Sequence, residues 1–373
     1  MARTDLVVVG GGIAGLSAAI RAAEEGARVT LVDAGVNAGS TANAGSLHVQ
    51  LQSRFIRLYP DQAPNVEASL PLYLAAVAEW DRLEAEHGPF EMVRKGGLML
   101  AEGEEQLRFL EAKARREERY GLKVEMLDRA ALDAVLPGLG PQITGAELCR
   151  DEGKLNPLQA NIRLRELAAM LGVRFVRDRI VAIEPDPAVA RGEQASYGGD
   201  RIVVSAAWGA GALVGTLGLA MPASAEPLHM NITEPAPVFI NHLVQHAERS
   251  ITLKQFASGQ IVIGGGWAAR SRGDWSTPEV LAASLLGNVG LAARLMPAIA
   301  GLRVIRTWAG MNTTIDGKSV VGPVPGAERI VIAVPGDAGY TLGPLCGRLG
   351  AEVAMGVAPL LDPAPYSPAR FSA

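Results

Sequence analysis

Short apolar runs alternate with helical segments along the chain, and the first of them predicts a buried strand. Residues 6–9 (LVVV) are apolar throughout and mostly β-branched, which is typical of a strand covered on both faces of a parallel sheet. Residues 13–25 have a helical composition that Gly26 ends, and a second apolar run over residues 28–32 ends on Asp33. The N-terminal segment therefore predicts a strand, a helix and a second strand.

Later segments also alternate between predicted strands and helices, except for a central region that predicts strands alone. Helices are predicted over residues 62–87, 103–120 and 154–172, and strands over residues 173–176 and at the start of 200–214. Between about 216 and 305 the pattern changes to alternating strands, including SITLKQF and GQIVIGGG. The C-terminal part predicts a strand over 330–334, a glycine-rich turn over 335–343 and a helix over 345–355. Two lobes interleaved along the chain follow from this order.

Three glycines join the first predicted strand to the first helix with the spacing of a dinucleotide-binding turn. Gly10 allows the tight turn, Gly12 lets the backbone approach a pyrophosphate, and Gly15 lets the helix pack close to the strand. Asp33 lies 23 residues after Gly10, where its carboxylate can accept a hydrogen bond from a ribose hydroxyl. A glycine-rich turn that binds no ligand is the alternative.

Composition narrows the class of protein. The chain has 373 residues, 49% of them hydrophobic, which is enough for a large core in two lobes. A net charge of -4 gives no basic surface for nucleic acid. We find no apolar run long enough to span a membrane and no secretory signal, so we expect a cytoplasmic protein. Cys149 and Cys346 lack metal-ligand spacing, so we expect two buried thiols and no bound metal.

Two irregular segments are candidates for ligand binding. Residues 34–53 form a long stretch rich in Gly, Ala, Ser and Asn, and a loop of that length is typically functional. Near the C-terminus, the backbone N–H groups of residues 339–342 would point out of a helix N-terminus. Such a helix end would stabilise the negative charge of a reduced flavin. An ordinary glycine-rich loop is the alternative, and an NAD-binding protein would leave this second turn unused.

Five segments, in order, resemble the FAD-dependent D-amino acid oxidase superfamily, which includes glycine oxidase and the sarcosine oxidases. The segments are VVVGGGIAGLSAA, STANAGSL, IVVSAAWGAG, WAGMNTTIDGKSVVG and GDAGYTLGP. The loop NAGSLHVQLQSRFIRL is most similar to the β subunits of heteromeric dehydrogenases that act on opines, D-hydroxyproline or L-proline. The resemblance implies an α/β fold: a Rossmann-like FAD-binding domain of the glutathione-reductase type, and an α+β substrate domain built on an antiparallel sheet.

The resemblance also implies domain limits and FAD contacts. The FAD-binding domain would be discontinuous, over residues 1–85, 145–215 and 305–373, and the substrate-binding domain would take residues 86–144 and 216–304. An adenine contact is expected in the region 176–180. The implied FAD-binding residues are Gly10, Gly12, Ile13, Ala14, Gly15, Asp33, Ala34, Ser40, Thr41, Asn43, Ala44, Gly45, Ser46, Leu47, Val176, Ala206, Ala207, Trp208, Gly310, Gly336, Gly339, Tyr340, Thr341 and Leu342.

The chain departs from the family pattern at two places. The family's NAAG turn reads SAAWG over residues 205–209, so the turn beside the adenosine is shifted or bulkier. After WAG, the amine oxidases of the family carry an Arg-Pro pair whose arginine clamps the substrate carboxylate, whereas this chain has Met311 and Asn312. An asparagine cannot form that ion pair, and the pattern favours a secondary amine over a primary D-amino acid.

Oxidation of an amine by hydride transfer to flavin N5 needs a neutral amine in a fixed orientation, because the cofactor performs the difficult step. Charge elsewhere on the substrate needs a partner. The candidate substrate-site residues are Arg54, Arg57 and Lys254 for a carboxylate, His48 beside the flavin loop, and Gln50, Gln52 and Asn312 as neutral hydrogen-bond partners. Surface arginines and a buried, satisfied histidine are the alternatives.

The sequence thus predicts an FAD-dependent amine dehydrogenase acting on a small secondary amine of the opine, hydroxyproline or proline class. Its electrons would pass to partner subunits that carry further redox centres, which agrees with the lack of cluster-forming cysteines. A single-subunit oxidase of the glycine or sarcosine type, producing hydrogen peroxide, is one alternative. A non-catalytic FAD-binding scaffold, or a chain that modifies a tRNA or protein partner, is another.

Overall fold

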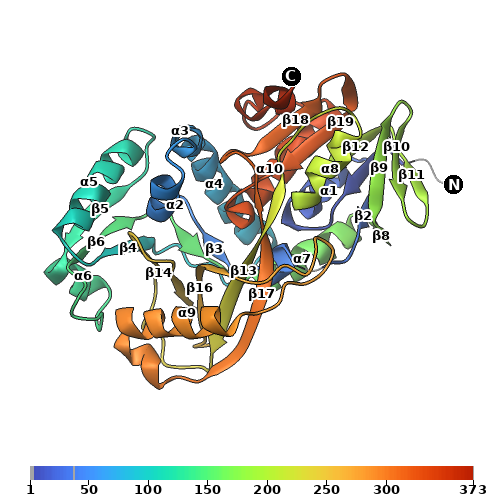
Figure 1. The fold of residues 1–373 in the computed structure, drawn as a ribbon. Coiled ribbons are helices and arrows are strands. Elements are labelled where there is room, and N and C mark those ends of the chain that lie inside the picture. The colour runs from blue at the N-terminus through green and yellow to red at the C-terminus, as the bar shows by residue number, and fades with distance from the viewer. Residues whose placement is uncertain (1–3, 37, 373) are drawn as a thin grey trace.

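The computed structural model describes residues 4–36 and 38–372, and two sheets dominate it (Figure 1). The ends of the expected domain ranges, residues 1–3 and 373, and Asn37 in the long loop lie outside the described residues. The first sheet has six strands, in the spatial order β18 (Val320–Val324), β19 (Ala327–Val334), β12 (Arg201–Val204), β1 (Leu6–Val9), β2 (Val29–Asp33) and β8 (Arg174–Arg177). All neighbours pair in parallel except β18, which is antiparallel to β19.

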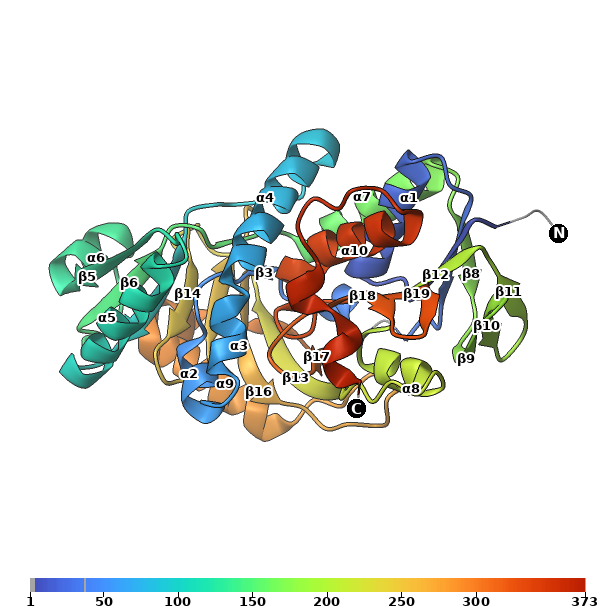
Figure 2. The same cartoon turned by 90° about the horizontal axis from the view of Figure 1, so that it is seen from above.

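The central strands of this sheet are buried on both faces, as their apolar runs predict, whereas the edge strand β8 is partly exposed. Leu6 and Val8 pack in one core together with residues of the helices, whereas Val7 and Val9 pack in a second core on the opposite face. The helices on the first face are α1 (Ile13–Glu24), α4 (Leu70–His87), α7 (Pro157–Met170) and α10 (Gly339–Met355), three of which lie side by side in Figure 2. The other face carries β9 (Ile180–Pro185), β10 (Ala188–Gly192), β11 (Ser196–Gly198) and α8 (Ala210–Gly215).

The second sheet has eight strands and makes up the other lobe. Its spatial order is β17 (Val304–Thr314), β13 (Ser224–Thr233), β16 (Ile261–Ala268), β15 (Thr252–Gln255), β14 (Leu243–His246), β4 (Gly97–Ala101), β6 (Gly145–Cys149) and β5 (Val124–Asp128). All pairings are antiparallel except that of β14 with β4. The expected α/β fold with an antiparallel second sheet is therefore confirmed.

Three helices cover this second sheet, and shorter elements link the two lobes. The covering helices are α5 (Glu104–Glu118), α6 (Arg129–Val135) and α9 (Ala282–Leu295). In both views α5 and α6 lie at the opposite end of the molecule from β9–β11 (Figures 1 and 2). The shorter elements are β3 (Ser46–Leu47), α2 (Ser53–Leu58), α3 (Ala63–Ala68), β7 (Gly153–Lys154) and 3-10 turns at Ser40–Ala42, Ala207–Gly209, Pro297–Gly301, Ala364–Tyr366 and Pro368–Phe371.

Helix α10 begins six residues earlier than the sequence pattern predicts, at Gly339 instead of residue 345. Gly336 lies in a turn before the helix, with φ +71°, but Gly339 and Gly343 are helical, and glycines of α10 let it pack directly on α1. A Cβ atom at Gly343 would lie 2.3 Å from Ile13 Cγ2, and one at Gly347 would lie 2.0 Å from Ala14 O. The single helix predicted over residues 62–87 is instead divided into α3 and α4, with Pro71 in the first turn of α4.

Two expected domain limits differ from the membership of the sheets. Residues 145–149 and 305–314 were assigned to the FAD-binding domain, yet β6 and β17 are strands of the eight-stranded sheet. A short apolar run does not reveal which of two sheets it joins, because strands of both sheets carry such runs. The division into two domains remains a prediction, and we propose that its limits follow the sheets.

Candidate active site

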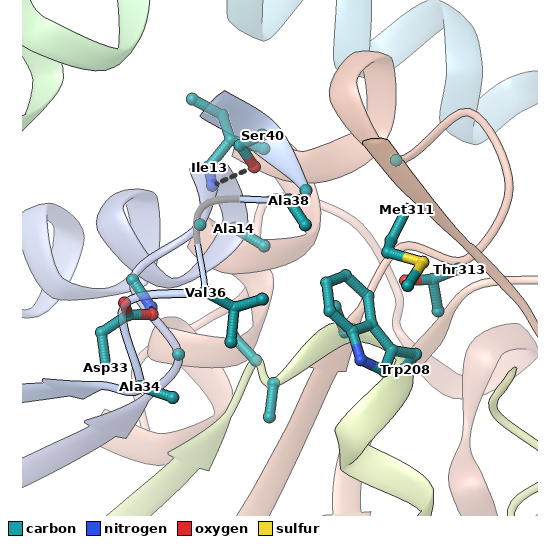
Figure 3. Close-up of a pocket in the computed structure, with 18 of the residues that line it drawn as sticks. Ile13, Ala14, Asp33, Ala34, Val36, Ala38, Ser40, Trp208, Met311 and Thr313 are labelled. Carbon is teal, nitrogen blue, oxygen red and sulfur yellow. Dashed lines mark hydrogen bonds between the residues drawn. The ribbon is translucent and has the colours of Figure 1, made fainter. Parts of the chain in front are cut away.

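A first cavity lies at the carboxyl ends of the parallel strands, where ligands of open α/β sheets bind. It encloses about 1260 Å³ of empty space, part of it open to solvent. Asp33 and Ala34 lie on one side of it, and Trp208, Met311 and Thr313 on the opposite side (Figure 3). The residues predicted for FAD that line it are Gly10, Gly12, Ile13, Ala14, Asp33, Ala34, Ser40, Thr41, Asn43, Ala206, Ala207, Trp208, Gly336, Gly339 and Tyr340.

The glycine turn has the geometry that its spacing predicts. Gly10 adopts φ +104°, in the region that favours glycine, and a Cβ atom at Gly15 would lie 1.8 Å from Gly10 O. Gly15 is thus a packing position between helix and strand and does not line the cavity. Asp33 fastens the turn, since its carboxylate accepts hydrogen bonds from Gly11 N at 2.6 Å and Gly35 N at 2.7 Å.

The start of α1 suits a phosphate group. The N-cap residue is Gly12, which has no side chain that could cap the helix, and the first turn of α1 holds no acidic residue. Only Ser40 approaches, its Oγ accepting a hydrogen bond from Ile13 N at 2.9 Å (Figure 3). Backbone N–H groups at a helix N-terminus attract anions. The residues present therefore fit the pyrophosphate of a dinucleotide.

Several residues predicted for FAD line neither cavity, each for a local reason. Val176 pairs with Val32 inside the sheet, and the cavity is instead lined two to four residues later by Asp178, Arg179 and Ile180. Gly310 lets β17 approach the loop, because a Cβ atom there would lie 2.9 Å from Ala42 Cβ. The remaining four are Gly45, Leu47, Thr341 and Leu342, all of which are buried.

Sequence reasoning missed one wall of the first cavity, which the connection between β16 and α9 supplies. Trp275 of this connection lines the cavity, with the Arg179 guanidinium 5.2 Å from the centre of its ring. The indole N–H of Trp208 donates to Asp274 O at 3.0 Å. No periodic pattern in the polar segment around Trp275 indicates that it crosses to the other lobe. The other missed residues are Val9, Gly11, Val32, Val36, Ala38, Gly39, Ser205, Leu213, Met311, Thr313 and Pro335.

A second cavity adjoins the first. It encloses about 2240 Å³ of empty space, again partly open to solvent, and lies between the long loop and the eight-stranded sheet. The two cavities share Asn43, Asn312, Gly339 and Tyr340. Four of the five residues predicted for catalysis line the second cavity, namely His48, Arg54, Lys254 and Asn312, together with Gln52, Ala44 and Ser46.

Lys254 projects from β15 and is fully buried. Its Nζ contacts Ser46 Oγ at 2.7 Å and Thr252 Oγ1 at 3.2 Å, and it has no carboxylate partner among the described residues. Burial, assisted by the positive charge of Lys154, lowers the pKa of Lys254 to about 7. Near neutral pH this side chain therefore exists in both the charged and the neutral form.

His48 lies close to Lys254 at the end of the loop. Its backbone N–H donates to Thr341 Oγ1 at 2.9 Å, which ties the loop to the start of α10. Burial and the charge of Lys254 lower the pKa of His48 to about 3. The imidazole is consequently neutral at physiological pH and offers hydrogen bonds rather than charge.

Gln50 lies outside both cavities, so its prediction as a substrate contact is wrong. Its side chain is buried in a polar network, donating to Glu152 Oε2 at 2.7 Å and accepting from Lys113 Nζ at 3.2 Å. In this loop Gln50 points away from the cavity that His48 and Gln52 line. Arg57 is likewise outside, paired with Glu248 at 3.0 Å.

Asn312 occupies an acidic part of the second cavity. Its amide Nδ2 lies 3.1 Å from Asp337 Oδ1 and 3.4 Å from Glu226 Oε2. Burial raises the pKa of Asp337 to about 6, and the neighbouring charge of Glu226 acts in the same direction, against the hydrogen bond from Asn312. Sequence reasoning missed both carboxylates: the pairing of β13 with β17 brings Glu226 to Asn312, and Asp337 arrives from the turn between β19 and α10.

A family model for FAD-dependent oxidoreductases, the DAO family, matches residues 5–353. The chain belongs to this family. Glycine oxidase of Pseudomonas aeruginosa is 29% identical to this oxidoreductase, and the match covers 98% of each chain. In fold it is similar to glycine oxidase from Geobacillus kaustophilus (TM-score 0.83, 22% identity, 100% of both chains) and to L-proline dehydrogenase from P. horikoshii (TM-score 0.84, 20% identity, 99% of this chain and 98% of the other).

The oxidoreductase is therefore FAD-dependent. Cys149 and Cys346 are free and buried, as expected. Among residues 4–36 and 38–372 we find no group of three or more His, Cys, Asp and Glu placed to hold a metal ion. Over the same residues, no helix combines the length and the apolar character needed to cross a membrane. A cytoplasmic location remains a prediction.

Proposed function

We propose that this oxidoreductase oxidises an amino acid or a related amine to the corresponding imine. Family membership supports this proposal, as does the similarity to glycine oxidases over nearly the whole chain. The observation that carries it is the junction of the two cavities at Asn43, Asn312, Gly339 and Tyr340. A dinucleotide in the first cavity would place its reactive end at that junction, facing a ligand in the second.

The FAD-binding roles that we assign follow the first cavity. The start of α1 would hold the pyrophosphate, Asp33 would accept from the adenosine ribose, and residues 178–180 with Trp208 would enclose the adenine end. The start of α10 would border the flavin ring, where the Tyr340 ring stacks on Trp80 with 5.5 Å between centroids. When bound, FAD supplies the acceptor for the two electrons that leave the substrate as the C–N bond becomes a C=N bond.

The residues of the second cavity bind and orient the substrate. Lys254, in its charged form, and Arg54 would hold a carboxylate, while the neutral His48 offers a hydrogen bond beside it. Asn312 cannot replace the arginine clamp, because the carboxylates beside it would repel a carboxylate. Because the chain lacks that arginine, we favour a secondary amine, such as an N-substituted amino acid, as the substrate.

The similarity to glycine oxidases supports an enzyme that works as a single kind of chain better than it supports a subunit of a heteromeric dehydrogenase. The heteromeric assembly, and the opine, hydroxyproline or proline substrates, rest on the loop resemblance alone. Reaction with oxygen separates the two possibilities. An isolated chain that turns over and releases hydrogen peroxide is an oxidase, whereas one that is reduced by substrate and reacts slowly with oxygen requires another acceptor.

The testing experiment is an anaerobic titration of the FAD-loaded chain with a panel of amines. The panel holds glycine, sarcosine, D-alanine, L-proline, D-hydroxyproline and octopine, and the flavin absorbance near roughly 450 nm is followed as it bleaches on reduction. Bleaching by secondary amines supports the proposal, and bleaching by glycine and D-alanine alone favours the glycine-type alternative. A flavin that stays oxidised with every amine would instead indicate a binding scaffold. Lys254→Met, which should bind FAD but lose substrate affinity, is the control.

A further inference from the structure

The second cavity is lined by side chains of both charges. The cations are Lys254 and Arg54, together with Arg249, which is paired with Glu102. The anions are Glu226 and Asp337, which approach the same amide of Asn312. Both carboxylates line the second cavity and neither lines the first, so they face the substrate volume rather than the dinucleotide.

Neither carboxylate is neutralised by the protein. Within the described residues Glu226 and Asp337 form no ion pair, whereas nearby Asp316 is bound by Arg370 at 2.8 Å. Their only hydrogen-bond donor from a side chain is the neutral amide of Asn312. Two carboxylates that share one neutral donor in a partly buried cavity repel each other, and a cation between them relieves that repulsion.

The same cavity holds buried polar atoms that have no partner in the protein. Gln245 is 2% exposed and its Oε1 accepts no hydrogen bond from the described residues, and the same is true of Nδ1 of His229, which is fully buried. Both residues line the second cavity. Unpaired buried polar atoms are costly, so they indicate that a polar ligand completes them.

We propose that the substrate carries a second positive charge, remote from the reacting nitrogen, which Glu226 and Asp337 bind while Lys254 and Arg54 hold the carboxylate. The substrate class is therefore an amino acid with a guanidinium or a terminal ammonium group, free or N-substituted. This inference rests on the proposed function. It orients the substrate with its carboxylate away from Asn312 and its cationic end toward the exposed carboxylate of Glu226.

The test uses substrates that differ only in the distal charge. Racemic arginine and citrulline have nearly the same shape, and each is supplied free and as its N-carboxyethyl derivative. At pH 7 the rate of flavin reduction at low substrate concentration should favour arginine over citrulline by up to about fivefold, since partly exposed ion pairs contribute up to about 1 kcal/mol. The E226Q and D337N variants should each reduce that preference, and the double variant should bring it close to one.

Glu328→Gln is the matched control, because Glu328 is an exposed carboxylate that lines neither cavity, and its removal changes net charge equally. Equal loss of arginine and citrulline activity in D337N would overturn the inference, since Asp337 would then serve the reacting amine. A wild-type preference near one, with simple amines still bleaching the flavin, would also overturn it and leave the proposed function intact. Calorimetric binding of arginine and citrulline gives the same comparison without turnover, and equal affinities in the absence of any flavin reduction would refute both.

Discussion

Lys254 gives the second cavity a charge that depends on pH, and this dependence can be measured. The perturbation is a titration from pH 6 to pH 9 of the oxidised, FAD-loaded chain with a simple carboxylate such as propionate, which cannot be oxidised as an amine. Lys254 changes charge within this range because its pKa is lowered to about 7. His48, with a pKa of about 3, stays neutral throughout.

The magnitude follows from the pKa of the free site. A carboxylate that binds only the protonated lysine keeps its full affinity below pH 7 and loses it about tenfold for each pH unit above. Between pH 6 and pH 9 the dissociation constant of propionate should therefore rise about 100-fold. The rise ends at the pKa that Lys254 has in the propionate complex. The sign is that of a group whose cationic form is needed for binding, so affinity falls as pH rises.

The assay is the change in flavin absorbance on addition of propionate, with FAD content recorded at each pH. Lys254→Met should bind propionate weakly at every pH and show no inflection. Lys154→Met is the matched control, because Lys154 lies outside both cavities and its charge contributes to the lowered pKa. In that variant the inflection should move to higher pH. A dissociation constant that stays flat in the wild type would refute the assignment of Lys254 as the carboxylate partner.

Three further changes test the packing of the site. Gly15→Ala places a methyl group against Gly10 O, so we expect loss of roughly 1–3 kcal/mol of stability and of bound FAD, measured by thermal unfolding and flavin content; unchanged values would contradict the close approach. Trp275→Ala should weaken FAD binding about tenfold at unchanged melting temperature of the apoprotein, measured by flavin fluorescence, whereas equal affinity would remove Trp275 from the site. Glu152→Ala leaves four N–H groups without their acceptor, and should cost roughly 3–5 kcal/mol in urea unfolding; a loss below 1 kcal/mol would show that the network is dispensable.

The parts of the site that the sequence predicts are those set by local backbone geometry. Gly10, Gly12 and Gly15 have fixed roles in a strand-turn-helix unit, so their spacing alone places them. The segment 176–180, where the sequence predicts an adenine contact, lines the cavity at its end and not at its start, because a strand pattern does not reveal where the last paired residue lies. Val176 is still paired with Val32, and the cavity begins at Asp178.

The parts that the sequence does not predict depend on contacts between distant segments. Gln50 and His48 are two residues apart on one loop, yet His48 lines the cavity and Gln50 joins a network with Lys113 and Glu152. Trp275 and Glu226 belong to segments whose patterns carry no sign of a ligand. Both reach the site through the tertiary arrangement of the eight-stranded sheet, which no local pattern specifies.

The contact between Lys254 and Ser46 explains why the charge of the cavity can change without disturbing the cofactor loop. A protonated lysine donates to Ser46 Oγ, and a neutral lysine can accept a hydrogen bond from the same hydroxyl, so the contact at 2.7 Å survives both states. A carboxylate in place of Ser46 would stabilise the charged form of Lys254 and so raise its pKa. We therefore expect Ser46→Asp to shift the inflection in propionate binding upward by more than one pH unit, and an unmoved inflection would mean that another group titrates.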